Sequence, residues 1–358
     1  LDEMVNVAKE MQRQDFHVPL LIGGATTSKI HTAVKIEPQY QNDIVVYVPD
    51  ASRAVGVASA LLSKEQKPAY VAAIREEYAQ IRAKRAANQS ERKLIAIADA
   101  RANGFNADWA NYAPPQPKIN GNQSLVFENY PLAELVERID WTPFFRSWEL
   151  AGRFPDILTD EIVGEECRKL YADAQAMLQK IVAENWVQAK AVIGLFPANS
   201  VGDDIELYSD NSRGQVQHKL HHLRMQMERN GQQPNYCLSD FIAPKHTQQA
   251  DWLGAFAVST SFGIEAHLQA FRAQNDDYSA IMLEALVDRL AEALAERMHE
   301  RVRKEFWGYA SDETLTNDQL VAEQYQGIRP APGYPACPEH TEKGTLWQLL
   351  DVEANTGI

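Results

Sequence analysis

Four prolines stand within nine residues near the end of the chain, in the segment IRPAPGYPACPEH at positions 328–340. Proline fixes φ and has no N–H to donate, so this segment can form neither a helix nor a central strand. The residue before each proline is also restricted to extended conformations. We therefore expect a stiff, extended segment whose carbonyls and amides remain available to another group.

Composition and charge narrow the class of protein. With 358 residues the chain is long enough for two or three domains, and it has the hydrophobic content (45%) of an ordinary globular protein. We see no signal peptide and no apolar run that could span a bilayer. The net charge of −14 argues against a nucleic-acid partner. The three cysteines are widely spaced, so we expect a reducing cytoplasm and no disulfide framework.

The first part of the chain alternates between helical and strand patterns. Leu1 begins a helical face without a preceding cap, so we expect a fragment that starts within a domain. Two short apolar runs follow, each leading into a turn and a helical pattern, which predicts a parallel α/β sheet. Such sheets bind ligands beyond the carboxyl ends of their strands. Small residues stand there that would let a ligand approach the backbone, although paired glycines are more often simple turns: Gly23, Gly24 and Ala51.

A charged, then proline-rich stretch separates this part from the rest. We predict a first domain at 1–88 with a Rossmann-like α/β half-domain fold, a linker at 89–128, and an α+β domain at 129–358. Within the last domain the patterns predict a helix start near Trp141, a strand–turn–strand unit, a further strand and one long helix. The helix start lies at 141–150, the strand–turn–strand unit at 191–208, the further strand at 251–260 and the long helix at 276–306.

Histidines and cysteines give weak signals. His218 and His222 lie four residues apart in QHKLHHLRMQ, which we expect to be helical, but no acidic residue flanks them. A solvated or packed helix face therefore explains them better than a metal site. Cys337 and His340 form one C-x-x-H pair without further ligands, and no nucleophile–base motif is present. We predict no metal ligand.

Acidic residues of the long helix form a stripe at four-residue spacing: Glu284, Asp288, Glu292 and Glu296. Like charges at this spacing repel each other by about 0.2–0.5 kcal/mol per pair. Two interpretations stay open, a solvated helix face or a stripe that faces a cationic ligand.

Four further residues are candidates for ligand binding. Asp140 precedes a helix start and either caps that helix or holds an ammonium or hydroxyl group. Arg329 directly precedes the proline-rich segment, where a guanidinium suits a bidentate carboxylate contact. Gly333 allows a turn or a close approach, and Tyr334 supplies a flat amphipathic face.

The segment RPAPGYPACPEH resembles the S-adenosylmethionine-binding motif of the reactivation domain of cobalamin-dependent methionine synthase. DWTPFF, GLFPANSVGDDIELY, NYCLSDFIAP and GAFAV also resemble that domain. LLIGGATTSKIHTAVKI and VPDASRAVGV, in the first 63 residues, resemble the second half of that family's cobalamin-binding domain. The resemblance covers essentially the whole chain, and its motifs are long and specific.

The resemblance implies a role for each candidate. Arg329 matches a residue that binds the methionine carboxylate, and the backbone around Ala331 matches the part that receives adenine. Gly333 lies in the same ligand-binding segment. Asp140 matches a contact to the amino-acid end of the ligand. Tyr334 matches a residue near the corrin, and Asp288 and Glu292 match acidic residues that face the cofactor. Three residues of the first domain match positions that contact or accommodate cobalamin: Gly23, Gly24 and Ala51.

Two departures limit the match. The D-x-H-x-x-G motif, whose histidine binds cobalt in this family, is not found. His31 does not replace it, since Lys29 and Val34 occupy the motif's other two positions. A final tyrosine-bearing segment of the family's ligand site is also missing, so we expect both ligand sites to be incomplete and the fragment alone to lack full activity.

By resemblance the parent enzyme is a methyltransferase that transfers methyl from 5-methyltetrahydrofolate to homocysteine through methylcobalamin. This part would support remethylation of cob(II)alamin with S-adenosylmethionine, with electrons from a flavodoxin-like donor. The homocysteine and methyltetrahydrofolate domains, with their zinc, would be partners outside this chain. The alternative is a non-catalytic S-adenosylmethionine sensor, but a sensor has no need of residues 1–63. A sugar-phosphate or nucleotide enzyme lacks its phosphate loop here.

Overall fold

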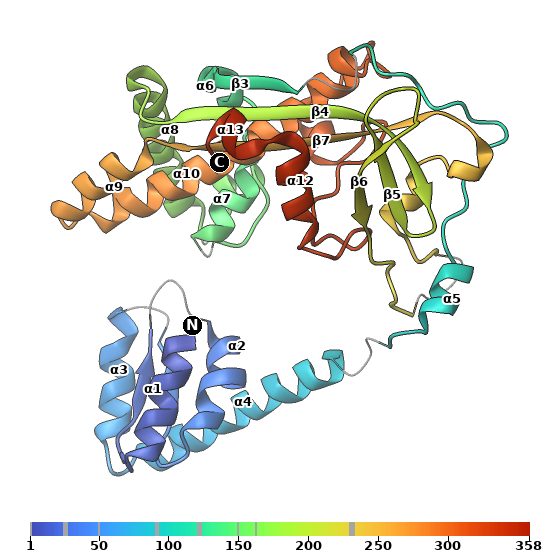
Figure 1. Ribbon diagram of the computed structural model, residues 1–358. Helices are drawn as coiled ribbons and strands as arrows, with labels where there is room; N and C mark the ends of the chain where they lie inside the picture. Colours follow the sequence, from blue (N-terminus) through green and yellow to red (C-terminus); the bar gives the residue numbers. More distant parts are fainter. Residues whose placement is uncertain are drawn as a thin grey trace. The chain divides into compact units, whose positions relative to one another are not determined.

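The computed structural model describes residues 2–23, 28–48, 51–89, 93–119, 124–148, 150–161, 163–228 and 233–358. By its internal contacts the chain divides into two compact units, Leu1–Lys93 and Leu94–Ile358 (Figure 1). Each unit has its own hydrophobic core, and each is described separately below.

The first unit is a two-stranded parallel sheet covered by helices. Strands β1 (Leu20–Ile22) and β2 (Val45–Tyr47) pair in parallel, with Leu20 opposite Val45. Adjacent residues of β2 enter different hydrophobic clusters, Val45 in one and Val46 in the other. Burial on both faces is the pattern of a parallel sheet between helices. The remaining elements are α1 (Asp2–Arg13), α2 (Lys29–His31), η1 (Thr32–Ile36), η2 (Glu37–Gln39), α3 (Ala51–Leu62) and α4 (Lys67–Gln89).

The second unit contains a five-stranded antiparallel sheet built on β4 (Gln188–Val201). Strand β7 (Asp251–Phe262) pairs with β4 over nearly its whole length, with Ile193 opposite Phe256. Two strands share the other edge of β4: β3 (Leu125–Tyr130) pairs near its start and β5 (Asp204–Tyr208) near its end. Strand β6 (Val216–His221) pairs with β5. The strand–turn–strand prediction and the separate strand are confirmed.

A long helix, α10 (Asp277–Arg301), covers one face of this sheet and continues as the π-helical η6 (Val302–Phe306) (Figure 1). Its buried apolar row includes Leu283, Leu286, Leu290 and Leu294, which share a core with Ile193 of β4. The backbone is tied to the sheet as well, because the Thr260 hydroxyl donates to the Val287 carbonyl at 2.7 Å. The predicted long helix at 276–306 is confirmed.

Further helices complete the two layers. On the α10 side lie α6 (Leu132–Val136), α7 (Trp141–Ser147), η3 (Asp156–Thr159), α8 (Gly164–Glu184) and α9 (Ile264–Ala273). The second core contains Val192, Phe196 and Ala198 of β4 with residues of α12 (Glu342–Leu350) and α13 (Val352–Thr356). Because successive side chains of β4 point to opposite faces of the sheet, this strand contributes to both hydrophobic cores. The other elements are α5 (Ile97–Ala102), η4 (Leu238–Phe241), η5 (Lys245–Thr247) and α11 (Asn317–Val321).

The structure differs from the sequence predictions at two segments. Part of the expected linker, residues 94–119, belongs to the second unit: Ile95 N–H donates to the Gln226 carbonyl at 2.9 Å, and the Trp307 indole donates to the Pro115 carbonyl at 2.6 Å. The expected helix around His218 is wrong, since these residues form β6. Backbone pairing with β5 and alternate burial along the strand prevail there over the four-residue histidine spacing.

Candidate functional site

The proline-rich segment is folded into tight turns rather than extended. Gly333 N–H donates to the Cys337 carbonyl at 2.8 Å, Tyr334 N–H to the Ala331 carbonyl at 3.0 Å, and Cys337 N–H to the Tyr334 carbonyl at 3.0 Å. The segment forms neither helix nor central strand, as predicted, but the expected extended conformation is wrong. Gly333 is the physical reason, because its φ of +111° reverses the chain where other residues rarely go.

This folding changes which groups of the turn are available. The Ala331 carbonyl also accepts from the Cys337 thiol at 3.2 Å, so that oxygen is used within the turn. Ala331, Gly333 and Tyr334 all remain exposed, and Tyr334 presents 59% of its surface. The predicted residues of this segment are therefore brought together in one exposed turn.

Arg329, at the entrance to these turns, is already bound to α10. Its Nη2 donates to Glu296 Oε2 at 3.0 Å. Burial raises the pKa of Glu296, and the positive charges of Arg329 and Arg303 oppose that rise. Among the described residues, the buried Nε of Arg329 has no hydrogen-bond partner. The last residue of the acidic stripe is thus the one that contacts the predicted carboxylate-binding arginine.

The rest of the stripe faces outward. Glu284, Asp288 and Glu292 are exposed, and 68% of the Asp288 side chain is accessible beside its ion-pair partner Arg289. Arg272 pairs with Glu284 at 2.9 Å. The structure does not bring Asp288 or Glu292 into contact with the turn at Ala331–Tyr334, and their predicted roles rest on the resemblance.

Asp140 is the N-cap of α7. Its Oδ1 accepts from Thr142 N–H at 3.0 Å, which confirms the capping interpretation. The helix then buries Trp141, Phe144 and Phe145 in the core shared with α10. Since a carboxylate has two oxygens, this cap leaves Asp140 capacity for a second donor.

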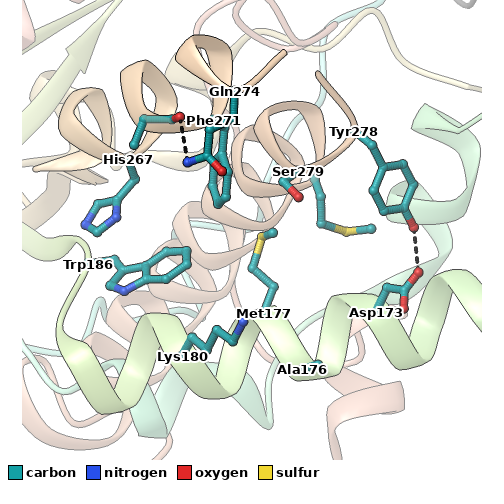
Figure 2. A pocket seen from close by; sticks show the side chains of 12 residues that line it. Asp173, Ala176, Met177, Lys180, Trp186, His267, Phe271, Gln274, Tyr278 and Ser279 are labelled. Atoms are coloured by element: carbon teal, nitrogen blue, oxygen red, sulfur yellow. Dashed lines mark hydrogen bonds between the residues drawn. The ribbon is translucent and has the colours of Figure 1, made fainter. Parts of the chain in front are cut away.

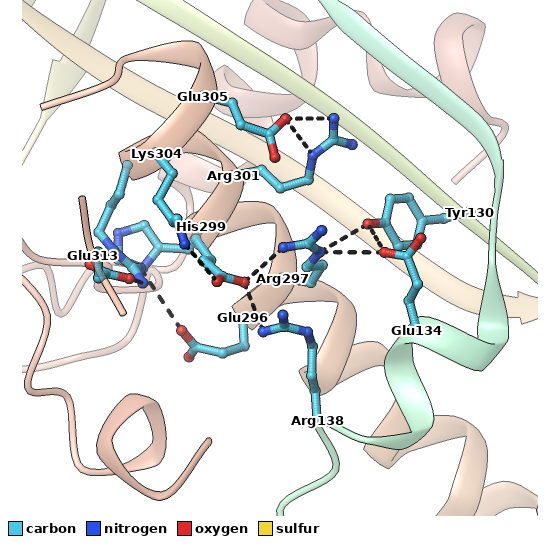
Figure 3. A network of polar contacts seen from close by, with 12 residues as sticks. Tyr130, Glu134, Arg138, Glu296, Arg297, His299, Arg301, Lys304, Glu305 and Glu313 are labelled. Carbon is cyan, nitrogen blue, oxygen red and sulfur yellow. Dashed lines mark hydrogen bonds and ion pairs between the residues drawn. The ribbon is translucent and has the colours of Figure 1, made fainter. Parts of the chain in front are cut away.

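A buried polar cluster behind Glu296 was not predicted from the sequence. Arg303 is completely buried, donates twice to Glu313 at 2.9 and 2.6 Å, and donates to Nδ1 of His299 at 2.7 Å. Its guanidinium carbon lies 4.3 Å from the centre of the Tyr325 ring. Burial, with the charges of Arg303 and Arg329, lowers the pKa of His299 to about 3, so His299 is neutral and can accept. Figure 3 shows Glu296, His299 and Glu313 close together.

A second group of ions in Figure 3 links α10 to β3 and α6. Glu300 accepts from Arg297 at 2.9 Å and from Arg138 at 2.8 Å. Arg297 also donates to the Tyr130 hydroxyl at 3.0 Å, which donates to Glu134 at 2.7 Å. One signal for both groups was present in the sequence, the density of Glu, Arg and His at 296–305. The spacing of these residues along the helix did not show which of their side chains are buried.

The predicted residues of the first unit lie at its strand ends. Gly23 follows β1, and a Cβ there would lie 3.2 Å from the Val48 carbonyl oxygen, so close strand packing already favours glycine. Ala51 is the first residue of α3, and its side chain lies outside the described part. Gly24 lies outside the described residues altogether.

The second unit contains a cavity of about 490 Å³ between α8, α9 and the start of α10. Trp186 stacks there on His267 with ring centres 4.4 Å apart (Figure 2). None of the predicted site residues lines it. Within the described part of the chain, no group of three His, Cys, Asp or Glu side chains is placed to hold a metal ion. In that same part, no helix is long and apolar enough to cross a membrane.

The second unit is thus a mixed α/β domain in which a long helix packs on an antiparallel sheet, and an arginine at the entrance to an exposed glycine–proline turn is bound to that helix. A family model described as the activation domain of vitamin B12-dependent methionine synthase matches residues 131–358. This chain belongs to that family.

A solved structure agrees with the family. It is described as the crystal structure of the MetH reactivation domain bound to AdoHcy, and it is 53% identical to this chain in sequence. The match covers 74% of this chain and 80% of the solved one, with a TM-score of 0.69. The resemblance to the reactivation domain of cobalamin-dependent methionine synthase is therefore confirmed, as is the mixed α/β class of the fold.

Proposed function

We propose that this chain binds S-adenosylmethionine and presents its methyl group for the reductive remethylation of cobalamin. One observation carries this proposal: Arg329 is held at the entrance to an exposed turn, with a buried N–H that lacks an acceptor among the described residues. A ligand carboxylate would supply that acceptor in a charge-assisted bond. The similar MetH domain binds AdoHcy, which is what S-adenosylmethionine becomes after it gives up its methyl group.

Each predicted residue has a role in this proposal. Arg329 binds the carboxylate of the methionine part, and Asp140 receives its ammonium group through the oxygen that does not cap α7. The exposed backbone at Ala331 and Gly333 contacts adenine. Exposed Tyr334 faces the methyl acceptor, and the acidic side chains that attract the sulfonium cation are Asp288 and Glu292.

We further propose that the first unit is part of a Rossmann-like cobalamin-binding domain. The parallel strands β1 and β2 end side by side, since Val48 N–H donates to the Ile22 carbonyl at 2.8 Å. Ligands of α/β sheets bind at such ends, so the residues present fit one edge of a cobalamin site. Gly23, Gly24 and Ala51 would hold the cofactor there. Cobalamin, when bound, supplies the cobalt centre that takes up the methyl group after one-electron reduction.

The wider reaction is proposed for the complete enzyme. It is a methyltransferase of methionine biosynthesis that moves methyl from 5-methyltetrahydrofolate to homocysteine. A flavodoxin-like protein in the cytoplasm would supply the electron. The homocysteine and folate domains would be the partners of this chain, and they would carry the zinc.

Calorimetric titration with AdoHcy and S-adenosylmethionine tests the proposal. We expect the original chain to bind both ligands and Arg329→Ala to lose about 2–3 kcal/mol, because a charge-assisted contact is removed. That loss corresponds to roughly 30- to 150-fold in Kd. Arg329→Lys keeps the charge but loses the planar fork, so we expect it to lie between the two.

Arg272→Ala is the matched control, since it removes an arginine that pairs with a glutamate of the same helix at 2.9 Å, but on the exposed surface. It should leave the affinity unchanged. Absence of binding by the original chain, or full affinity in Arg329→Ala, would contradict the proposal. Binding without any remethylation, when cobalamin and a reductant are supplied, would favour the sensor alternative.

A further inference from the structure

Four side chains form a line of alternating charge that ends at Arg329: Glu313, Arg303, Glu296 and Arg329. Arg303 binds Glu313 through two nitrogens, at 2.9 and 2.6 Å. On its other side the Arg303 Nη1 lies 3.9 Å from Glu296 Oε1. Glu296 Oε2 then accepts from Arg329 at 3.0 Å. We call these four residues the charge line.

Arg303 is the most buried member, and from Arg303 to Arg329 the side chains become more exposed. The exposed fraction of the side chain is 0% for Arg303, 8% for Glu313, 12% for Glu296 and 26% for Arg329. Two members, Glu296 and Arg303, are seven residues apart and so lie on the same side of the helix two turns apart. Glu313 and Arg329 belong to the segment that follows the helix, and their ion pairs hold this segment against it.

Arg303 is fixed by everything around it. Besides Glu313, it donates to His299 Nδ1 at 2.7 Å and stacks over the Tyr325 ring at 4.3 Å. The Tyr325 ring also meets the His299 ring edge to face, with centres 4.8 Å apart. A completely buried guanidinium with these partners cannot move without losing several charged contacts. Its contact with Glu296 at 3.9 Å is an ion pair without a hydrogen bond, so Arg303 acts on Glu296 through its charge.

Arg329 is the member with unused capacity. Only its Nη2 contacts Glu296, and its buried Nε has no partner among the described residues. The four charges of the line sum to zero, two acids and two bases, so the arginine is compensated but not saturated. Arg329 also interacts with the side chain of Tyr325. An arginine held by such partners is oriented in advance for an incoming carboxylate, which lowers the entropy cost of binding.

We propose that Glu296, Arg303 and Glu313 are positioning residues for Arg329: they orient its guanidinium toward the ligand carboxylate and do not touch the ligand. This inference rests on the proposed role of Arg329. The positioning role predicts an effect that a direct contact between Arg329 and the ligand carboxylate does not predict. Charge removed at Glu313, three contacts away from Arg329, weakens ligand binding.

The test is a double-mutant cycle of Glu313→Gln and Arg329→Ala, read by calorimetry with AdoHcy and by thermal unfolding. Glutamine keeps the size of Glu313 and one acceptor but removes its charge. We expect Glu313→Gln to weaken binding roughly tenfold, which equals about 1.4 kcal/mol. In the Arg329→Ala background the same change should have no effect on Kd, because its influence passes through Arg329.

Glu305→Gln is the matched control. Glu305 also accepts two bonds from an arginine of this helical region, Arg301, at 3.0 and 2.8 Å, but it is not part of the charge line. Its replacement should leave the affinity for AdoHcy unchanged.

The outcomes separate the two proposals. If the original chain does not bind AdoHcy, the proposed function fails. If Arg329→Ala weakens binding but Glu313→Gln lowers only the unfolding temperature, the charge line is structural and the positioning inference is wrong. Additive losses in the double variant would also overturn it. If Glu313→Gln does not fold, Glu296→Gln replaces it in the cycle with the same expectations.

Discussion

Gly333→Ala is the change that most directly tests the turn around Ala331. Gly333 has a φ of +111°, and a Cβ built on it would lie 2.4 Å from Cε1 of His340. Two costs therefore arise, one from the backbone conformation and one from the clash. Because the turn is closed by few hydrogen bonds, at 2.8, 3.0 and 3.0 Å, the strain can be relieved by opening the turn instead of unfolding the domain.

The two costs differ in size. An alanine in such a sparsely populated region of φ costs about 1–3 kcal/mol. The clash is cheaper, since His340 is exposed and can leave its rotamer for about 0.5–1.5 kcal/mol. If the ligand needs the closed turn, a backbone cost of 1–3 kcal/mol, approximately, lowers its affinity by roughly 5- to 150-fold. Global unfolding should change by less, because an open turn escapes the strain.

Calorimetry with AdoHcy on Gly333→Ala, His340→Ala and the double variant separates these costs. We expect Gly333→Ala and the double variant to be weakened to nearly the same extent, and His340→Ala to bind normally. Hydrogen exchange should show faster exchange at the amides of residues 333 and 337 in both variants that carry the Gly333→Ala change. Full affinity in Gly333→Ala would refute the requirement for the closed turn. Full recovery in the double variant would show that the clash, not φ, is the dominant cost.

Two further changes test other parts of the second unit. The double substitution Asp288→Asn, Glu292→Gln should change the free energy of unfolding by no more than about 0.5 kcal/mol, since both residues are exposed. It should lower the rate of remethylation when cobalamin, a reductant and S-adenosylmethionine are supplied. Undiminished activity would show that the stripe is only a solvated helix surface. Burial raises the pKa of Asp251 to about 6. The backbone N–H groups of Ala243 and Trp252 each donate to its carboxylate at 2.7 Å and lower the pKa, but burial has the larger effect. The folded state therefore holds this proton more tightly than the unfolded one, so a contribution to stability of about 3 kcal/mol is present below pH ~4 and is lost as the pH rises through ~6. Urea unfolding across this range should show that the pH dependence is reduced in Asp251→Asn, and an equal slope in both proteins would contradict the assignment.

Local patterns predicted most elements of the second unit. The apolar spacing of residues 276–306 identified α10 because one continuous side of that helix is buried. The Asp140 cap and Pro143 marked the start of α7 because both act on the first turn of their own helix. The same reasoning failed at His218–His222, where Leu220 and His222 are buried while Lys219 and His221 are exposed. That alternation was the signal for a strand, and the histidine spacing drew attention away from it.

The proline-rich segment shows a different limit. Each proline excludes helix and central strand, and that prediction is confirmed. What proline does not determine is whether the residues between prolines continue or reverse the chain. Here Gly333 reverses it, and the Ala331 carbonyl and Cys337 thiol stabilise the result at 3.2 Å. The family resemblance indicated the ligand, but the turn itself came from contacts that the sequence pattern does not encode.

The acidic stripe of α10 shows why a site can be only partly predicted from a helix. A spacing of four residues places Glu284, Asp288, Glu292 and Glu296 on one side, and it treats all four alike. The structure separates them, since the first three are exposed and only Glu296 is largely covered. Its partner Arg329 comes 33 residues later in the chain, so helix periodicity holds no information about this contact. The distinction within the stripe therefore arises from tertiary contact: Glu296 is covered and accepts from Arg329, whereas the other three acidic side chains are exposed on the helix surface.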